Sequence, residues 1–241
     1  MRLTDLTVRG FIDEVAASSP TPGGGSVSAL AAALAAALVS MVGSLSLRKL
    51  AAGASADRSP ERAPAPRAAM ASGPERVRAD TAAMDLIESD MTMAVEIAGD
   101  LRRHFERLVD EDAAAFDAVM AAYRLPKSTD EERESRSAAI QEALKEACRV
   151  PSEVAKGAVE VLRLSDLVAR EGAQSALSDA AVACLAADAA LHGAYLNVLI
   201  NLGSIKDQAL VAAMREEMAK AVKSGEAIRD QVMARVRKAL E

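Results

Sequence analysis

Apolar residues recur at helical spacing along most of the chain. Periodic segments cover about 8–17, 26–50, 75–124, 130–149, 151–172, 176–202 and 205–240, and no strand-like alternation of apolar and polar residues stands out. In 26–50 the large aliphatic side chains form one stripe, which we predict packs into the interior: Val27, Leu30, Leu34, Leu38, Met41 and Leu45. A second stripe, of alanine and serine, lets another helix approach closely. The pattern predicts an all-α protein.

Several residues mark where the helices begin and end. Thr129 is a good N-cap, and the three acidic residues after it suit the positive end of a helix. Pro151 is expected to start or kink the next helix, and Gly99 to divide or interrupt the segment 75–124. The segment 52–74 is rich in Ala, Pro, Ser and Gly and predicts a flexible insertion. We therefore expect a single domain, residues 1–241, folded as an up-and-down helical bundle with long Ala-rich central helices.

The composition and net charge of the chain disfavour several classes of protein function. The chain contains 54 alanines, 2% aromatic residues and no Trp, so it lacks the rings that a β-sandwich or a single-strand nucleic-acid binder needs. The net charge of −6 gives no attraction to nucleic acid or to an anionic membrane. The two cysteines, Cys148 and Cys184, are separate, which fits a reducing cytoplasm, and no cluster has metal-ligand spacing.

One stretch has the low charge of a membrane span, because no charged residue occurs between Glu14 and Arg48. That stretch contains Pro20, Pro22 and three glycines, and its apolar part is mostly alanine, which is weak for a span. A helix buried in a bundle is the better interpretation, and the N-terminus does not resemble a signal peptide.

The segment Gly23-Gly24-Gly25-Ser26 opens the long apolar helix. Glycines let backbone N–H groups approach a ligand closely, and a helix N-terminus favours electron-rich groups. No lysine follows in the position of a phosphate-binding loop, and no strand precedes the segment as in a dinucleotide fold. The alternative is a sharp turn needed only for packing.

Carboxylate and amide side chains are the other candidates for catalysis or ligand binding. Asp112 shares a helix face with Phe116, so it is a candidate general acid or base, with a solvated acidic patch as the alternative. Asn197 and Asn201 share a face of an apolar helix and need partners. Asp179, beside Ser178, caps that helix or contacts a ligand, but it lies about 27 Å from Asn197. The two would therefore line the ends of a long ligand or belong to separate sites across a dimer.

Several blocks together resemble the cyclodeaminase domain of the formiminotransferase-cyclodeaminase family, which includes stand-alone methenyltetrahydrofolate cyclohydrolases. They cover nearly the whole chain apart from roughly 50–75. The clearest are Pro20-Thr-Pro-Gly-Gly-Gly-Ser26, Asp110-Glu-Asp-Ala-Ala-Ala-Phe116, Val119-Met-Ala-Ala-Tyr-Arg-Leu-Pro-Lys127, Ser178-Asp-Ala-Ala-Val182 and Asn197-Val-Leu-Ile-Asn201.

The resemblance implies a helical homodimer that acts on the one-carbon unit of tetrahydrofolate. The cyclodeaminase closes 5-formiminotetrahydrofolate to the 5,10-methenyl form and releases ammonia. The cyclohydrolase hydrates that form to 10-formyltetrahydrofolate. Both need proton transfer and no cofactor beyond the folate substrate. The implied catalytic residues are Asp112 and Asp179, and the implied substrate-binding residues are Gly23, Gly24, Gly25, Ser26, Lys49, Ser178, Asn197 and Asn201.

Two further expectations follow from the resemblance. Lys49 stands where the family carries a lysine-rich run, which would pair with the glutamate tail of the folate or supply an ammonium group. The cyclodeaminase is the family's defining activity, and it would draw its substrate from a separate formiminotransferase. A non-catalytic dimer that binds folate or another ligand is the alternative. The scarcity of aromatic residues predicts that a bound pterin lies mainly against aliphatic side chains and backbone.

Overall fold

A computed structural model describes residues 2–57 and 74–241, with the side chains of 53–57 and 74–81 outside the description. The described residues form helices and no strand: η1 (Leu3–Asp5), α1 (Val8–Val15), α2 (Gly24–Asp57), α3 (Pro74–Tyr123), α4 (Asp130–Glu171), η3 (Gln174–Ala176), α5 (Leu177–Leu202) and α6 (Gln208–Leu240). The predicted all-α class is therefore confirmed.

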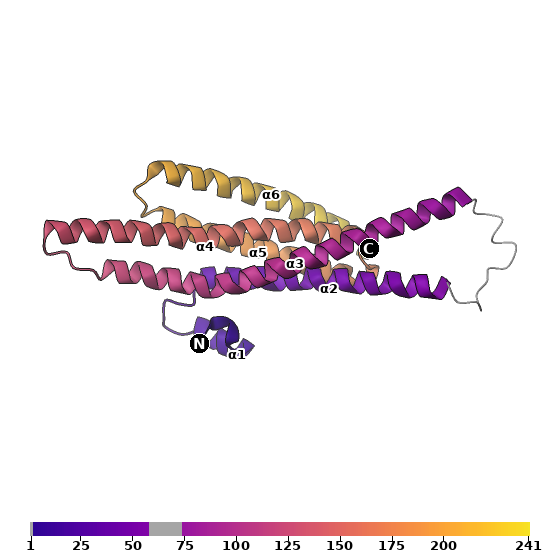
Figure 1. Cartoon of the computed structure of the whole chain (residues 1–241), viewed down its shortest axis with the longest axis horizontal. Coiled ribbons are helices and arrows are strands. Elements are labelled where there is room, and N and C mark those ends of the chain that lie inside the picture. The colour runs from indigo at the N-terminus through magenta and orange to yellow at the C-terminus, as the bar shows by residue number, and fades with distance from the viewer. Residues whose placement is uncertain (1, 58–73) are drawn as a thin grey trace.

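Four long helices form the body of the molecule (Figure 1). α2 packs on α3, α3 on α4, α4 on α5, and α5 back on α2, so the four close into a bundle in which successive helices run in opposite directions. α6 covers α4 and α5 from outside. α1 lies beside the bundle near the start of α2 (Figure 1).

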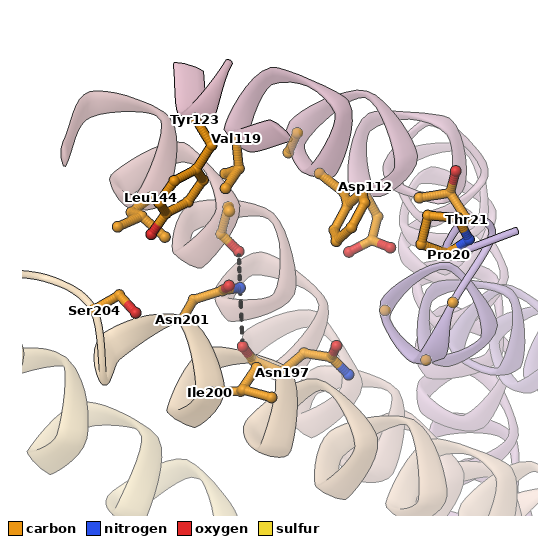
Figure 2. Close-up of a pocket in the computed structure, with 16 residues that line it drawn as sticks. Pro20, Thr21, Asp112, Val119, Tyr123, Leu144, Asn197, Ile200, Asn201 and Ser204 are labelled. Carbon is orange, nitrogen blue, oxygen red and sulfur yellow. Dashed lines mark hydrogen bonds between the residues drawn. The ribbon is translucent and has the colours of Figure 1, made fainter. Parts of the chain in front are cut away.

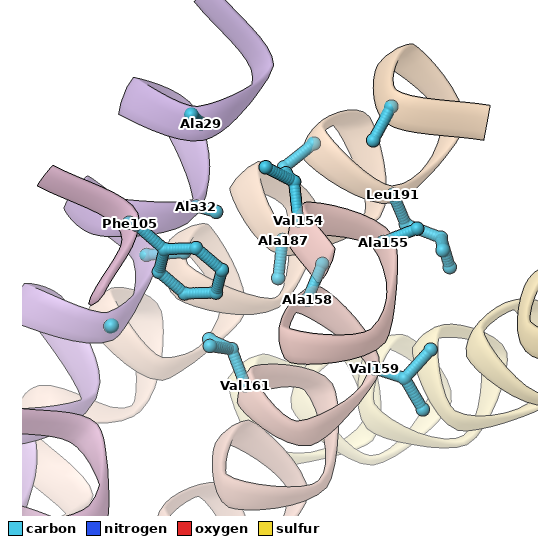
Figure 3. Close-up of a cluster of buried hydrophobic side chains, with 14 of the residues drawn as sticks. Ala29, Ala32, Phe105, Val154, Ala155, Ala158, Val159, Val161, Ala187 and Leu191 are labelled. Atoms are coloured by element: carbon cyan, nitrogen blue, oxygen red, sulfur yellow. The ribbon is translucent and has the colours of Figure 1, made fainter. Parts of the chain in front are cut away.

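The interior is built mainly from alanine and valine. Figure 3 shows Ala29 and Ala32 of α2 near Ala187 of α5, with Phe105 as the large side chain among them. Small side chains allow the helix axes to approach, and dispersion contacts over their full length then stabilise the bundle. The central position of the Ala-rich helices thus matches the prediction.

The predicted packing stripe of α2 is wrong in part. Four of its six members are exposed, by 40% for Val27, 57% for Leu34, 39% for Met41 and 38% for Leu45. The alanine face is buried instead, because the closer approach of α3 and α5 is possible only over small side chains. The chain alone therefore leaves a large aliphatic face uncovered.

Pro151 neither ends nor starts a helix, because α4 continues through it. A proline lacks the N–H that would bond to the carbonyl four residues earlier, which here belongs to Ala147. The side-chain amide of Asn201 donates to that carbonyl at 2.8 Å (Figure 2). A residue of α5 thus supplies the hydrogen bond that the proline removes, and this makes an uninterrupted α4 possible.

Other boundaries follow the sequence more closely. Thr129 caps α4 as predicted, with Glu132 completing a capping box. Gly99 does not interrupt α3. Of the predicted insertion 52–74, residues 58–73 lie outside the described residues. Residues 52–57 continue α2 because alanine favours helix, and Pro74 begins α3, where proline is favoured.

Two helices are long and apolar enough to cross a membrane on length and composition alone. They are 24–52, with mean hydropathy 2.1, and 174–202, with mean hydropathy 1.4. The core helices of a bundle pass the same test, and both contribute to the four-helix core here.

Candidate functional site

A pocket of about 420 Å³ lies at the end of the bundle where α2 begins (Figure 2). Its walls come from the turn before α2 and the first residues of α2, from α3, α4 and α5, and from Ser204 in the turn after α5. The predicted residues that line it are Gly23, Gly24, Gly25, Asp112, Asn197 and Asn201. Segments separated by more than 80 residues in the sequence therefore meet in one cavity.

Asp112 is held against the first turn of α2. The hydroxyl of Ser26, a fully buried residue, donates to Oδ2 of Asp112 at 3.0 Å, and the backbone N–H of Ser26 donates to the same carboxylate. A Cβ atom on Gly25 would lie only 2.0 Å from Oδ1 of Asp112. Glycine is therefore required at position 25 for the carboxylate to sit on the helix end.

Burial is the main influence on the protonation of Asp112. Removal from water raises its pKa above the ordinary value, and this effect exceeds the opposite effect of the two hydrogen bonds from Ser26. A carboxyl group with a raised pKa exchanges protons more readily near neutral pH. Asp112 is therefore a candidate proton-transfer group.

The three consecutive acidic residues of α3, Asp110, Glu111 and Asp112, have different contacts. Asp110 accepts hydrogen bonds from the backbone N–H of Leu3 at 2.5 Å and from the hydroxyl of Thr4 at 3.0 Å, which ties the N-terminal segment to α3. Glu111 forms an ion pair with Arg149 of α4 at 2.9 Å. Only the third, Asp112, lines the pocket, so the group is not simply a solvated acidic patch.

The two asparagines have different partners. The amide N–H₂ of Asn201 donates to the carbonyl oxygens of Ala147 at 2.8 Å and Asn197 at 3.0 Å, so its placement is explained by the fold. The amide of Asn197 donates to Gly193 within α5 at 2.8 Å. Asn197 also faces Gly24, where an added Cβ would lie 3.4 Å from its amide nitrogen. Asn197 is the stronger candidate for ligand contact.

Two of the five aromatic residues line the pocket, Phe116 and Tyr123. Each follows Asp112 at a helical interval on α3, and this spacing is the signal in the sequence that could have identified Tyr123. Arg136 fixes the end of α3 by donating to the carbonyl oxygen of Tyr123 at 3.0 Å, and its guanidinium lies 5.6 Å from the ring centre. The pocket thus offers two rings beside its aliphatic side chains and backbone, and the expectation that a pterin would lie mainly against the latter stays a prediction.

The remaining predicted residues lie elsewhere in the chain. Asp179 and Ser178 are in the first turn of α5, an uninterrupted helix, so Asp179 is about 27 Å from Asn197. Neither caps α5, whose N-cap is Ala176 without a side-chain hydrogen bond. Lys49 lines a second cavity, of about 400 Å³, near the C-terminal end of α4.

The structure thus divides the predicted site into two groups at opposite ends of α2 and α5. Among the residues described, no three His, Cys, Asp or Glu side chains are placed to hold a metal ion. The pocket offers a carboxylate, an amide, the N-terminus of a helix and two aromatic rings. This set suits a small aromatic ligand that is to receive or lose a proton.

Several known proteins are similar to this chain in sequence and fold. The family model described as formiminotransferase-cyclodeaminase matches residues 7–85 and 67–220. A methenyltetrahydrofolate cyclohydrolase of Methylorubrum extorquens is 37% identical over 88% of this chain and 86% of its own length. A formimidoyltransferase-cyclodeaminase of Mus musculus is 36% identical over 85% of this chain but only 32% of its own length. The crystal structure of a formiminotetrahydrofolate cyclodeaminase from Thermotoga maritima aligns with a TM-score of 0.67 and 27% identity, covering 98% of this chain and 96% of that one.

These matches place the chain in the class of folate enzymes that act on one-carbon units. The chain belongs to the formiminotransferase-cyclodeaminase family, as the sequence motifs predicted.

Proposed function

We propose that this protein is a methenyltetrahydrofolate cyclohydrolase, which adds water to the methenyl bridge of 5,10-methenyltetrahydrofolate and forms 10-formyltetrahydrofolate. The cyclohydrolase of Methylorubrum extorquens supports this choice over the cyclodeaminase, the other activity that the resemblance implies, because it is similar to this chain over most of both lengths. The observation that carries the chemistry is Asp112, a carboxylate whose pKa is raised by burial in a pocket of about 420 Å³.

Asp112 carries out two of the three proton movements of the reaction. As a carboxylate it takes a proton from water as the oxygen attacks the electrophilic methenyl carbon between N5 and N10. It then returns that proton to N5 as the bond between the carbon and N5 breaks, and the hydroxyl proton leaves to solvent as the formyl group forms on N10. The hydrogen bonds from Ser26 hold the carboxylate in place during both steps.

The pocket offers matching contacts for the rest of the folate. Its volume falls within the range of about 300–1,000 Å³ that holds small ligands. Phe116 and Tyr123 provide faces for the pterin and benzoyl rings, while Asn197 and the first turn of α2 offer hydrogen bonds to polar ring edges. We place no metal in this reaction, because the methenyl carbon is already an electrophile.

Cyclodeamination is the second candidate, and the aligned structure from Thermotoga maritima favours it. In that reaction N10 attacks the formimino carbon of 5-formiminotetrahydrofolate, and ammonia leaves after accepting a proton. Asp112 serves equally well, since it removes the proton of N10 and delivers one to the leaving nitrogen. A separate formiminotransferase would then supply the substrate, because the mouse relative combines both names in one longer chain.

We also propose that the protein works as a homodimer. The large aliphatic side chains exposed on α2 and α5 support this, since exposed apolar faces of this size mark protein interfaces or membrane contacts. The partner chain would cover the stripe that the sequence pattern marks for packing.

The test is turnover by Asp112→Asn. Purified protein is mixed with 5,10-methenyltetrahydrofolate and the loss of near-ultraviolet absorbance is followed, alongside ammonia release from 5-formiminotetrahydrofolate. Losing a general acid–base group lowers the rate by about 10²–10⁴-fold. Asp117→Asn, an exposed acid on the same helix, is the matched control and keeps its rate.

The pH profile gives an independent readout. Because burial raises the pKa of Asp112, the wild-type rate falls as the pH is lowered through that raised value, while the residual rate of Asp112→Asn does not show this step. Full turnover by Asp112→Asn removes the residue from the mechanism. A wild-type protein that is silent in both assays but binds folate establishes the non-catalytic alternative.

A further inference from the structure

The side-chain amide of Asn201 on α5 is held at its nitrogen end. Nδ2 donates to the carbonyl oxygen of Ala147 on α4 at 2.8 Å and to that of Asn197 at 3.0 Å (Figure 2). An amide N–H₂ group has two donors, so both are used. A reversed amide would place its oxygen against two carbonyl oxygens, which can only accept. The partners of Asn201 therefore fix the orientation of its side chain.

Pro151 is the reason that the carbonyl oxygen of Ala147 is available to this amide. In a regular helix that oxygen would accept from the backbone N–H of residue 151, but proline has no N–H. Ala147 and Pro151 are both buried, so an unpaired oxygen here would be costly. Pro151 thus provides the acceptor that turns the N–H₂ end of Asn201 toward α4.

The oxygen end of the same amide is open to the pocket. Asn201 is one of the lining residues, and its Oδ1 accepts no hydrogen bond from residues 2–57 or 74–241. Within those ranges, the side-chain atoms that are buried without a partner are Oγ of Ser40, Oδ1 of Asp166 and Nε of Arg235. Oδ1 of Asn201 is therefore unpaired but accessible, and it is the polar atom that this residue offers to a ligand.

Gln141 of α4 holds the next part of the same wall. Its Nε2 donates to the carbonyl oxygen of Ser204, which also lines the pocket, at 3.1 Å. Its Oε1 accepts from the backbone N–H of Lys206 at 2.7 Å. The C-terminal end of α5 and the turn after it are therefore tied to α4 at two places. A polar group on such a wall loses little freedom when a ligand binds, which favours selective binding.

We propose that Asn201 is a specificity-determining residue whose Oδ1 accepts a hydrogen bond from an N–H group of the ligand. An atom that can only accept binds a ligand donor and disfavours a ligand carbonyl or bare ring nitrogen at the same point. The inference rests on the proposed function and names the ligand group. Folate has such N–H donors on the pyrimidine edge of its pterin and on the amide of its glutamate tail. Asp112 comes from α3, so recognition and proton transfer belong to different helices (Figure 2).

Urea unfolding without ligand tests the pairing of Asn201 with Pro151. Asn201→Leu is expected to lower the unfolding midpoint, because it leaves the carbonyl oxygen of Ala147 unpaired. In the Pro151→Ala background, residue 151 has an N–H that bonds to this carbonyl. The same Asn201→Leu change is then expected to lower the midpoint by a smaller amount. Equal decreases in the two backgrounds overturn the pairing on which the proposal depends.

Ligand affinity in the Pro151→Ala background tests the role of the oxygen. Asn201→Asp and Asn201→Leu are a matched pair, because both lack the N–H₂ group and both branch at Cγ, but only Asp retains an acceptor. The dissociation constant of tetrahydrofolate is measured by isothermal titration calorimetry. Asn201→Leu is expected to bind about tenfold more weakly than Asn201→Asp. Equal affinities, or tighter binding by Asn201→Leu, overturn the proposal.

A smaller ligand identifies which part of folate carries the donor. 6-Methyltetrahydropterin has the pyrimidine edge of folate but no glutamate tail, and it is titrated into the same two variants. A difference between Asn201→Asp and Asn201→Leu that persists with this ligand places the donor on the pterin. A difference that occurs only with tetrahydrofolate places the donor on the tail amide. Either result supports an acceptor role for Asn201.

Failure of this inference and failure of the proposed function give different results. An active wild type whose two Asn201 variants bind tetrahydrofolate equally well refutes the role of Asn201 and leaves the function intact. A wild type that binds tetrahydrofolate without turnover refutes the cyclohydrolase, while the two affinities still decide the role of Asn201. A wild type that neither binds tetrahydrofolate nor turns over the methenyl form refutes both.

Discussion

Gly25→Ala tests whether the position of the Asp112 carboxylate controls turnover. The added Cβ would lie 2.0 Å from Oδ1 and 2.5 Å from Cγ of Asp112, whereas real contacts of this kind are longer than 3.0 Å. The carboxylate must therefore retreat by about 1 Å, which lengthens or breaks its 3.0 Å hydrogen bond with Ser26. Misplacing a reacting group by about 1 Å costs on the order of 100-fold in rate.

The same change has a modest effect on stability. Losing hydrogen bonds to a charged group costs about 1.5–3 kcal/mol, and replacing glycine by alanine in a helix returns up to about 1 kcal/mol. A net loss of about 1–2 kcal/mol lowers the Tm of a chain this long by roughly 2–8 °C. The variant should therefore be folded at 25 °C and have a kcat about 100-fold below the wild type.

The assay is the loss of methenyltetrahydrofolate absorbance at saturating substrate, with thermal unfolding followed by circular dichroism. Gly24→Ala is the matched neighbour, because its Cβ would lie at an ordinary 3.4 Å from Asn197. Its rate should exceed that of Gly25→Ala by at least about tenfold. Near wild-type turnover by Gly25→Ala, or equal losses in both variants, would refute the reasoning.

Packing and thiol burial give further predictions. Gly157→Ala should destabilise the chain by about 1–3 kcal/mol in urea unfolding, because its Cβ would lie 2.6 Å from the fully buried ring of Phe105. An unchanged unfolding midpoint would contradict this close contact between Gly157 and Phe105. Gly99→Ala should stabilise α3 by up to about 1 kcal/mol in the same experiment, because its Cβ would make only an ordinary contact, at 3.6 Å from Nη1 of Arg103. Burial raises the pKa of Cys148 to about 11 and that of Cys184 to about 12, so mass spectrometry should find neither alkylated by iodoacetamide at pH 8 until the protein is unfolded.

The sequence alone identified the residues around Asp112 but not the different contacts that each of them makes. Periodicity and family motifs selected Gly25, Asp112 and Asn197, which meet in one pocket. The separation of Asp179 from Asn197 also followed from the sequence, because helix rise is a local property. The different partners of Asp110 and Glu111 depend on contacts with the N-terminal segment and with α4, which no local pattern records.

What the sequence determined by itself was the helical class and most of the helices, since hydrophobic periodicity, alanine propensity and the Thr129 cap act over a few residues. Tertiary structure decided which side of each helix is buried. In α2 the alanine face is buried and much of the predicted leucine stripe is exposed, because helices that pack closely over alanine gain more dispersion contacts than helices held further apart by leucine. Tertiary structure also carried α4 through Pro151, because the carbonyl freed by the proline is satisfied by Asn201, 54 residues beyond Ala147 in the chain.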